Sequence, residues 1–162
     1  MVRRYVQVVE ALSRAGGFAA ALLLLVSMAV VCEMILMRYV FRAATIWQTE
    51  AVVFTATAAI FIGAPYVLLK KGHVGVDVIE TVVSPRASLR LRRIGAVLGL
   101  AFCLVMTVAT FVHFREALEG GWTTPSVAAV PLWMPLAPML AGFALLCLQY
   151  LAELFKLFGE AS

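Results

Sequence analysis

The residues that could do chemistry are few, and they lie in or beside long apolar segments. Glu33 is the one acid within the first of these segments. A carboxylate inside a membrane span is costly and is a candidate functional residue by default. It precedes Arg38 by five positions, about 7.5 Å along a helix. We therefore expect it to reach the membrane interface and pair with Arg38, Arg42 or a partner protein; proton coupling and a protonated acid facing lipid remain the alternatives.

Trp47 and Glu50 stand one helical turn apart at the start of the second apolar segment. Tryptophan is an interfacial anchor, and an acid is favoured at the positive N-terminus of a helix. Arg38 or Arg42 is available as a partner for Glu50 across the two segments. We predict a structural ion pair here that fixes the angle between them.

His73 and Asp77 follow the same segment at its other end, again one turn apart. Two side chains are too few for a metal site, and the second histidine, His113, is expected on the opposite side of the membrane. A proton relay would need a continuation into the membrane. The spacing favours a local hydrogen bond that orders the bend after the segment.

Enzyme chemistry has no support elsewhere in the sequence. There is no phosphate-binding loop, no nucleophile triad and no cluster of metal ligands, so we expect no catalytic residue, no metal and no cofactor. The three cysteines, Cys32, Cys103 and Cys147, all fall in apolar segments without a C-x-x-C pair. We interpret them as packing residues.

The apolar segments dictate the fold. Hydrophobic residues make up 64% of the 162 residues and charged ones 14%, which is far from a soluble composition. A helix needs about 20 apolar residues to cross the hydrocarbon core. We predict an all-α integral membrane protein, a single domain whose four transmembrane helices cover residues 17–37, 47–71, 90–114 and 132–155.

Basic residues set the expected orientation. Ten of the 13 lysines and arginines fall on the side that holds both termini and the loop after the second span. By the positive-inside rule that side is cytoplasmic. The net charge of +4 follows from the same rule and from anionic lipid, and it gives no reason to expect nucleic acid.

Two flanking segments read as interfacial amphipathic helices. Residues 1–14 carry one apolar stripe, and Gly16-Gly17 would supply a bend before the first span. Residues 74–93 form the second such segment, in which Ser84-Pro85 resembles a helix start. Pro65 predicts a kink in the second span.

Small residues recur at helical spacing on two spans. Gly95 and Gly99 open the third span, and Thr55, Ala59 and Gly63 repeat every four residues on the second. Such stripes let helices approach closely in lipid. We interpret them as packing faces within the chain or toward a larger partner.

In this order and spacing the motifs resemble the small membrane subunit of TRAP (tripartite ATP-independent periplasmic) transporters, the DctQ-type family. The matching positions are Arg38-Tyr39-Val40-Phe41, Trp47 with Glu50, Gly63-Ala64, His73 with Asp77, and the outer region with Gly120, Thr124, Pro131 and Trp133. Trp122 lies in the same outer loop and is a candidate partner-interface residue. One departure is Thr49, where the family often has a second acid.

The resemblance implies a non-catalytic subunit in the bacterial inner membrane. In that family a periplasmic protein captures an organic acid, and a large membrane subunit carries it inward with sodium. The small subunit packs against the large one and helps to dock the binding protein. The partners would thus be the large subunit, the binding protein and the lipid bilayer, with sodium coupling in the large subunit.

Three other classes compete with this interpretation. A small proton-coupled exporter would use Glu33, although such proteins are shorter and place the acid deeper. A quinone-linked thiol oxidoreductase would need paired cysteines that face outward. The small subunit of tripartite tricarboxylate transporters is the nearest rival.

Overall fold

The structure is a computed structural model that describes residues 2–70 and 85–159. Its helices are α1 (Val2–Tyr39), α2 (Gln48–Leu69), α4 (Pro85–Glu119) and α5 (Trp133–Gly159). Each is long and apolar enough to cross a membrane. In the described ranges, β-pairing is limited to an isolated bridge between Thr123 and Pro131. The predicted all-α fold with four membrane-spanning helices is confirmed.

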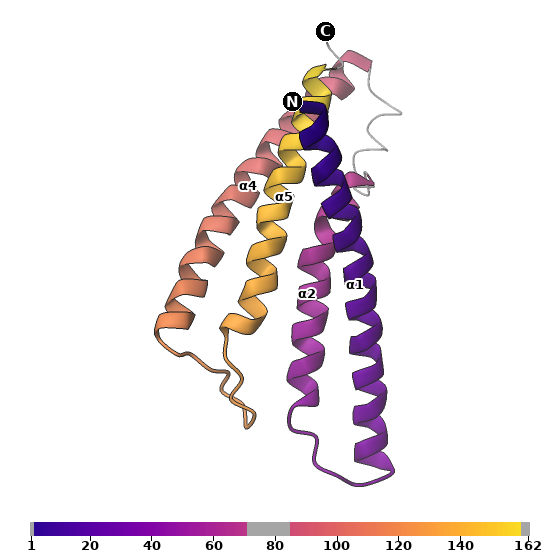
Figure 1. Cartoon of the computed structure of the whole chain (residues 1–162), viewed down its shortest axis with the longest axis vertical. Helices are drawn as coiled ribbons and strands as arrows, with labels where there is room; N and C mark the ends of the chain where they lie inside the picture. The colour runs from indigo at the N-terminus through magenta and orange to yellow at the C-terminus, as the bar shows by residue number, and fades with distance from the viewer. Residues whose placement is uncertain (1, 71–84, 160–162) are drawn as a thin grey trace.

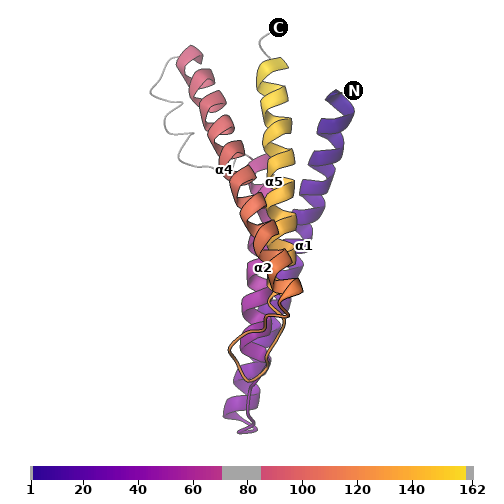
Figure 2. The ribbon, with the colours of Figure 1, turned by 90° about the vertical axis from the view of Figure 1, so that its left-hand side faces the viewer.

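The four helices form two hairpins that lie side by side (Figure 1). We call the end that holds both chain termini the terminal end, and the end that holds the α1–α2 and α4–α5 connections the loop end. α1 packs along α2, α2 along α5, and α5 along α4, while α1 also touches α5. Among the described helices α4 contacts α5 alone. At the terminal end α4, α5 and α1 spread apart, with α5 between the other two (Figure 2).

The first helix corrects one expectation. We predicted a separate N-terminal helix and a bend at Gly16-Gly17, but α1 continues unbroken through both glycines. They serve close packing instead: a Cβ at Gly16 would lie 2.7 Å from the carbonyl oxygen of Ile62, and one at Gly17 would lie 2.5 Å from the ring of Tyr66. The apolar stripe of residues 1–14 meets α5 in part, because Tyr5 stacks edge-on against Phe155; Val9 of the same stripe is buried.

The contact between α2 and α5 is built on a proline and a glycine. Pro65 is fully buried within α2 and has no N–H, so it leaves the carbonyl of Phe61 without its helical donor. Gly142 of α5 faces that same carbonyl: a Cβ on it would lie 2.6 Å from the carbonyl carbon of Phe61. Only a glycine allows the two backbones to come this close. The aromatic rings of Phe61 and Phe143 pack beside the contact at 5.1 Å.

The small-residue stripes divide between inward and outward faces. Gly63 packs against α1, since a Cβ there would lie 2.9 Å from that of Ala20. Gly99 packs against α5, where a Cβ would lie 2.5 Å from the ring of Tyr150. Gly95, by contrast, has open space around it. The second-span stripe and Gly99 are therefore packing positions within the chain, while Gly95 lies on an outward face.

The connection between α2 and α4 is described only in part. The described part of α4 begins at Pro85, and residues 85–93 belong to this long helix, while the expected helix start at Ser84-Pro85 stays a prediction. His73, Asp77 and most of the amphipathic segment 74–93 lie outside the described residues. The hydrogen bond expected between His73 and Asp77 stays a prediction.

The α2–α5 contact yields a matched pair of substitutions. Gly142→Ala should lower the free energy of unfolding by about 1–3 kcal/mol, because the new methyl group overpacks the contact with Phe61. Gly95→Ala should leave it unchanged or raise it by up to about 1 kcal/mol, because alanine is the better helix former and the site is open. Both can be followed by circular dichroism during unfolding in mixed detergent micelles. Equal effects of the two changes would contradict the packing role of Gly142.

Candidate functional site

Polar side chains gather at the loop end, where α2 begins. Trp47 precedes the helix and provides no side-chain cap, and its ring is about half exposed. Gln48 and Glu50 occupy the first turn of α2, and Gln48 is almost fully buried. Buried polar groups in a membrane protein need partners within the protein. Each of these two side chains finds one on a different element.

Gln48 pairs with Glu33 across the α1–α2 interface. Its Nε2 donates to Oε1 of Glu33 over 3.5 Å, a long hydrogen bond. The other oxygen of each side chain, Oε2 of Glu33 and Oε1 of Gln48, is buried without a hydrogen-bond partner. The amide therefore compensates only part of the desolvation of the carboxyl group. Glu33 is thus positioned by a side chain of α2.

The prediction that Arg38 or Arg42 forms an ion pair with Glu33 or Glu50 is wrong for the described residues. Arg38 donates to Oγ1 of Thr45 over 2.9 Å, which holds the connection after α1. Arg42 has a backbone φ of +53°, a left-handed conformation that turns the chain at this point. The ion pairs of the described residues join neither arginine to Glu33 or Glu50. Whether these arginines contact a partner stays a prediction.

Glu50 instead holds the loop between α4 and α5. Its Oε1 accepts a hydrogen bond from Oγ1 of Thr124 over 2.6 Å and a second, short one from Oγ of Ser126. The hydroxyl oxygens of Thr124 and Ser126 lie 2.9 Å apart. We call Glu50, Thr124 and Ser126 the latch. It ties the two hairpins together at the loop end.

A second set of contacts ties the hairpins together at the terminal end. Nζ of Lys156 lies 2.5 Å from Glu10 and 3.5 Å from Glu153. Oγ of Ser13 donates to Oε1 of Gln149 over 2.8 Å, and both side chains are fully buried. The hydroxyl of Tyr5 donates to the carbonyl of Leu148 over 3.0 Å. Apart from the contact between Lys156 and Glu153, which lies within α5, these contacts join the N-terminal part of α1 to α5.

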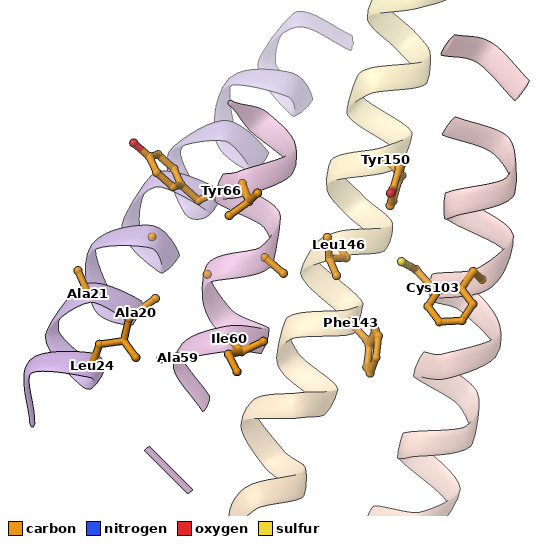
Figure 3. Close-up of a pocket in the computed structure, with 15 residues that line it drawn as sticks. Ala20, Ala21, Leu24, Ala59, Ile60, Tyr66, Cys103, Phe143, Leu146 and Tyr150 are labelled. Carbon is orange, nitrogen blue, oxygen red and sulfur yellow. The ribbon is translucent and has the colours of Figure 1, made fainter. Parts of the chain in front are cut away.

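Between the hairpins lies an apolar cavity of about 640 Å³. All four helices line it, as Figure 3 shows. In that view the hydroxyl of Tyr66 points away from α5, and the ring of Tyr150 lies toward α4. The labelled side chains facing the cavity from α5 and α2 include Phe143, Leu146 and Ile60. Such a lining suits hydrocarbon or apolar side chains, and it offers no cation for an organic acid.

Ligands for a metal are equally scarce. Residues 2–70 and 85–159 contain no group of three histidine, cysteine or acidic side chains placed to hold an ion. Cys103 and Cys147 are buried and unpaired, and Cys147 lies 3.5 Å from the hydroxyl of Thr107. Both contribute to α4–α5 packing. His113 packs edge-on against the ring of Trp122 at 5.6 Å, which helps to anchor the loop.

Comparison with known proteins identifies the family of the chain. Residues 27–160 match the family described as "Tripartite ATP-independent periplasmic transporters, DctQ component". The chain belongs to this family. It is therefore a component of a transporter rather than an enzyme, and a multi-pass protein of the bacterial inner membrane. The match also decides against the tricarboxylate transporter subunit considered from the sequence.

A curated relative supports the assignment. The chain is 30% identical over 78 residues to the C4-dicarboxylate TRAP transporter small permease protein DctQ of Vibrio cholerae serotype O1 (strain ATCC 39315 / El Tor Inaba N16961). The match covers 48% of this chain and 32% of that protein, so the matched part of the chain spans about a third of that relative's length. No solved structure matches it.

Sequence reasoning missed several residues of these polar contacts. Gln149 is a polar residue within an otherwise apolar span, a signal that it needs a partner. Gln48 lies between Trp47 and Glu50, which were both candidate site residues, and Ser126 lies in the predicted outer loop. Their roles depend on which elements meet, and periodicity within one segment does not carry that information.

Gln48 offers a test of the Glu33 pairing. Gln48→Leu should lower the free energy of unfolding by about 1–3 kcal/mol, because it leaves the carboxyl of Glu33 without its donor. Thr49→Val, one position on, should change it by less than about 0.5 kcal/mol, since Thr49 is exposed and its hydroxyl lies 3.8 Å from the sulfur of Met34. Unfolding in mixed micelles compares them. Equal losses would show that Gln48 is not a specific partner.

Proposed function

We propose that this DctQ chain is the scaffold subunit of an organic-acid transporter. It packs against a large membrane subunit and helps to dock a periplasmic substrate-binding protein. The observation that carries the proposal is how the polar side chains are used: Glu33, Glu50, Glu10 and Gln149 are all engaged by other side chains of the chain. The cavity between the hairpins has an apolar lining. A chain whose polar side chains bond one another and whose cavity is apolar is suited to act as a rigid support.

The orientation belongs to the same proposal. The terminal end carries most of the basic residues and would face the cytoplasm. Trp47, Glu50 and the latched loop would then face the periplasm, where a binding protein docks. The relative named as a C4-dicarboxylate permease supports a carboxylate substrate, with sodium coupling in the large subunit.

Outward-facing apolar surface supports a membrane partner. Gly95 lies in open space on α4, and α4 has α5 as its one neighbour among the described helices. Small residues at helix surfaces allow a second helix to approach closely. Gly95 is thus a candidate contact with the large subunit, and surrounding lipid covers what that subunit leaves free.

Purification tests the scaffold proposal directly. The chain should co-purify in stoichiometric amount with a co-expressed large subunit, and that complex, given its binding protein, should transport. Purified by itself it should bind no dicarboxylate in calorimetric titration, because its described core offers no cation. Saturable binding by the isolated chain would contradict the scaffold role.

Glu33 separates this proposal from the proton-coupled exporter. Glu33→Gln keeps a side chain that can hydrogen-bond with Gln48, so the reconstituted complex should retain uptake within about twofold of the unsubstituted rate, a change of less than about 0.5 kcal/mol. Uptake of radiolabelled dicarboxylate into proteoliposomes measures it. Abolished transport, or transport by this chain alone, would favour the exporter.

A further inference from the structure

Hydrogen bonds within the loop between α4 and α5 fold it into a defined shape. Thr124 N donates to Val130 O over 2.9 Å, and Leu132 N donates to Trp122 O over 2.9 Å. The N–H of Val130 donates to Oγ1 of Thr124 over 3.1 Å. With the bridge between Thr123 and Pro131, these bonds close residues 122–132 into a small hairpin.

Glu50 sets where this hairpin sits. Thr124 and Ser126 are 74 and 76 residues away in the chain, and both donate to the same carboxylate oxygen. Among the described residues, these two hydrogen bonds are the ones that join the loop to α2. Hydrogen bonds to a carboxylate are stronger than those between neutral groups. Without Glu50 the hairpin would lose these hydrogen bonds to α2.

The held hairpin presents one apolar side chain outward. Val127 is 88% exposed, the highest value among the large hydrophobic side chains of the described residues. It sits in a tight turn in which Ala129 N donates to Ser126 O over 3.1 Å, and Ala129 has a φ of +45°. The hydroxyl next to Val127, that of Ser126, is turned back to the latch. The turn therefore shows an apolar tip.

An ordered tip of this kind fits a protein partner better than lipid. Fixing a loop before binding reduces the entropy lost on association, which benefits a specific and repeated contact. A single valine offers little apolar area for insertion among lipid headgroups. The occupant at this end, if the proposed orientation holds, is the periplasmic substrate-binding protein.

We propose that Glu50 is a positioning residue for docking, which holds Thr124 and Ser126 so that the tip at Val127 contacts the binding protein. This inference rests on the proposed function and names the element that would perform it. Glu50 itself need not touch the partner. Its role is carried by the loop.

The test uses the small–large complex in nanodiscs, with two readouts. Hydrogen–deuterium exchange of the peptide that covers residues 122–132, measured without binding protein, reports the latch; surface plasmon resonance reports docking. Glu50→Ala should speed exchange of this peptide and weaken docking about tenfold, as the loss of a hydrogen bond to a charged group predicts. Glu50→Gln, which keeps an acceptor oxygen, should restore part of both.

Two further variants distinguish the position of the hairpin from the contact that Val127 makes and from the loss of an acidic side chain. Val127→Asp should weaken docking while exchange stays as in the unsubstituted chain. Glu119→Ala removes an exposed acid at the same end, one that bonds Arg115, and should change neither readout.

The outcomes are distinct. Unchanged exchange in Glu50→Ala overturns the latch, and unchanged docking in both Glu50→Ala and Val127→Asp overturns the role of the tip. If the unsubstituted complex binds no binding protein, the proposed function fails and the docking half of this inference fails with it. Faster exchange in Glu50→Ala would in that case still support the latch.

Discussion

The close approach of α2 and α5 at Phe61 and Gly142 is the constraint on which the rest of the structure depends. It is the place where the middles of the two hairpins meet, and it needs two sequence features at once. Pro65 frees a carbonyl on α2, and the glycine on α5 removes the side chain that would keep the helices apart. Because lipid is as apolar as the helix surfaces, burial of leucine supplies little association energy here. Close backbone packing supplies it instead.

Polar contacts then fix what packing leaves free. At the terminal end, Lys156 and Gln149 on α5 engage Glu10 and Ser13 on α1. At the loop end, Glu50 on α2 engages the loop that leads into α5. The two sets lie at opposite ends of the helices (Figure 1), so together they oppose rotation of one hairpin against the other. Stiffness of this kind suits the proposed scaffold role.

The elements could be predicted from the sequence because each depends on local information. Four apolar runs of membrane length specify four helices. The contacts between elements are a different matter. The stripe in residues 1–14 fits a lipid interface and a neighbouring helix equally well, and the structure chooses α5. Gly16-Gly17 suggested a bend, since glycine destabilises an isolated helix, but packing against Ile62 and Tyr66 outweighs that preference. By distance along the chain, Glu50 could pair with Arg38 or Arg42. It bonds hydroxyl groups instead because the loop between α4 and α5 folds against the start of α2.

The single neighbour of α4 has a consequence for how the chain assembles. During synthesis the first two helices can join as soon as both have entered the bilayer, because they pack along each other. α4 emerges next and finds no described helix to pack against until α5 follows. Until then its apolar length lets it remain in the bilayer. Among the described helices, α5 is the element that joins the two hairpins, since both α2 and α4 contact it.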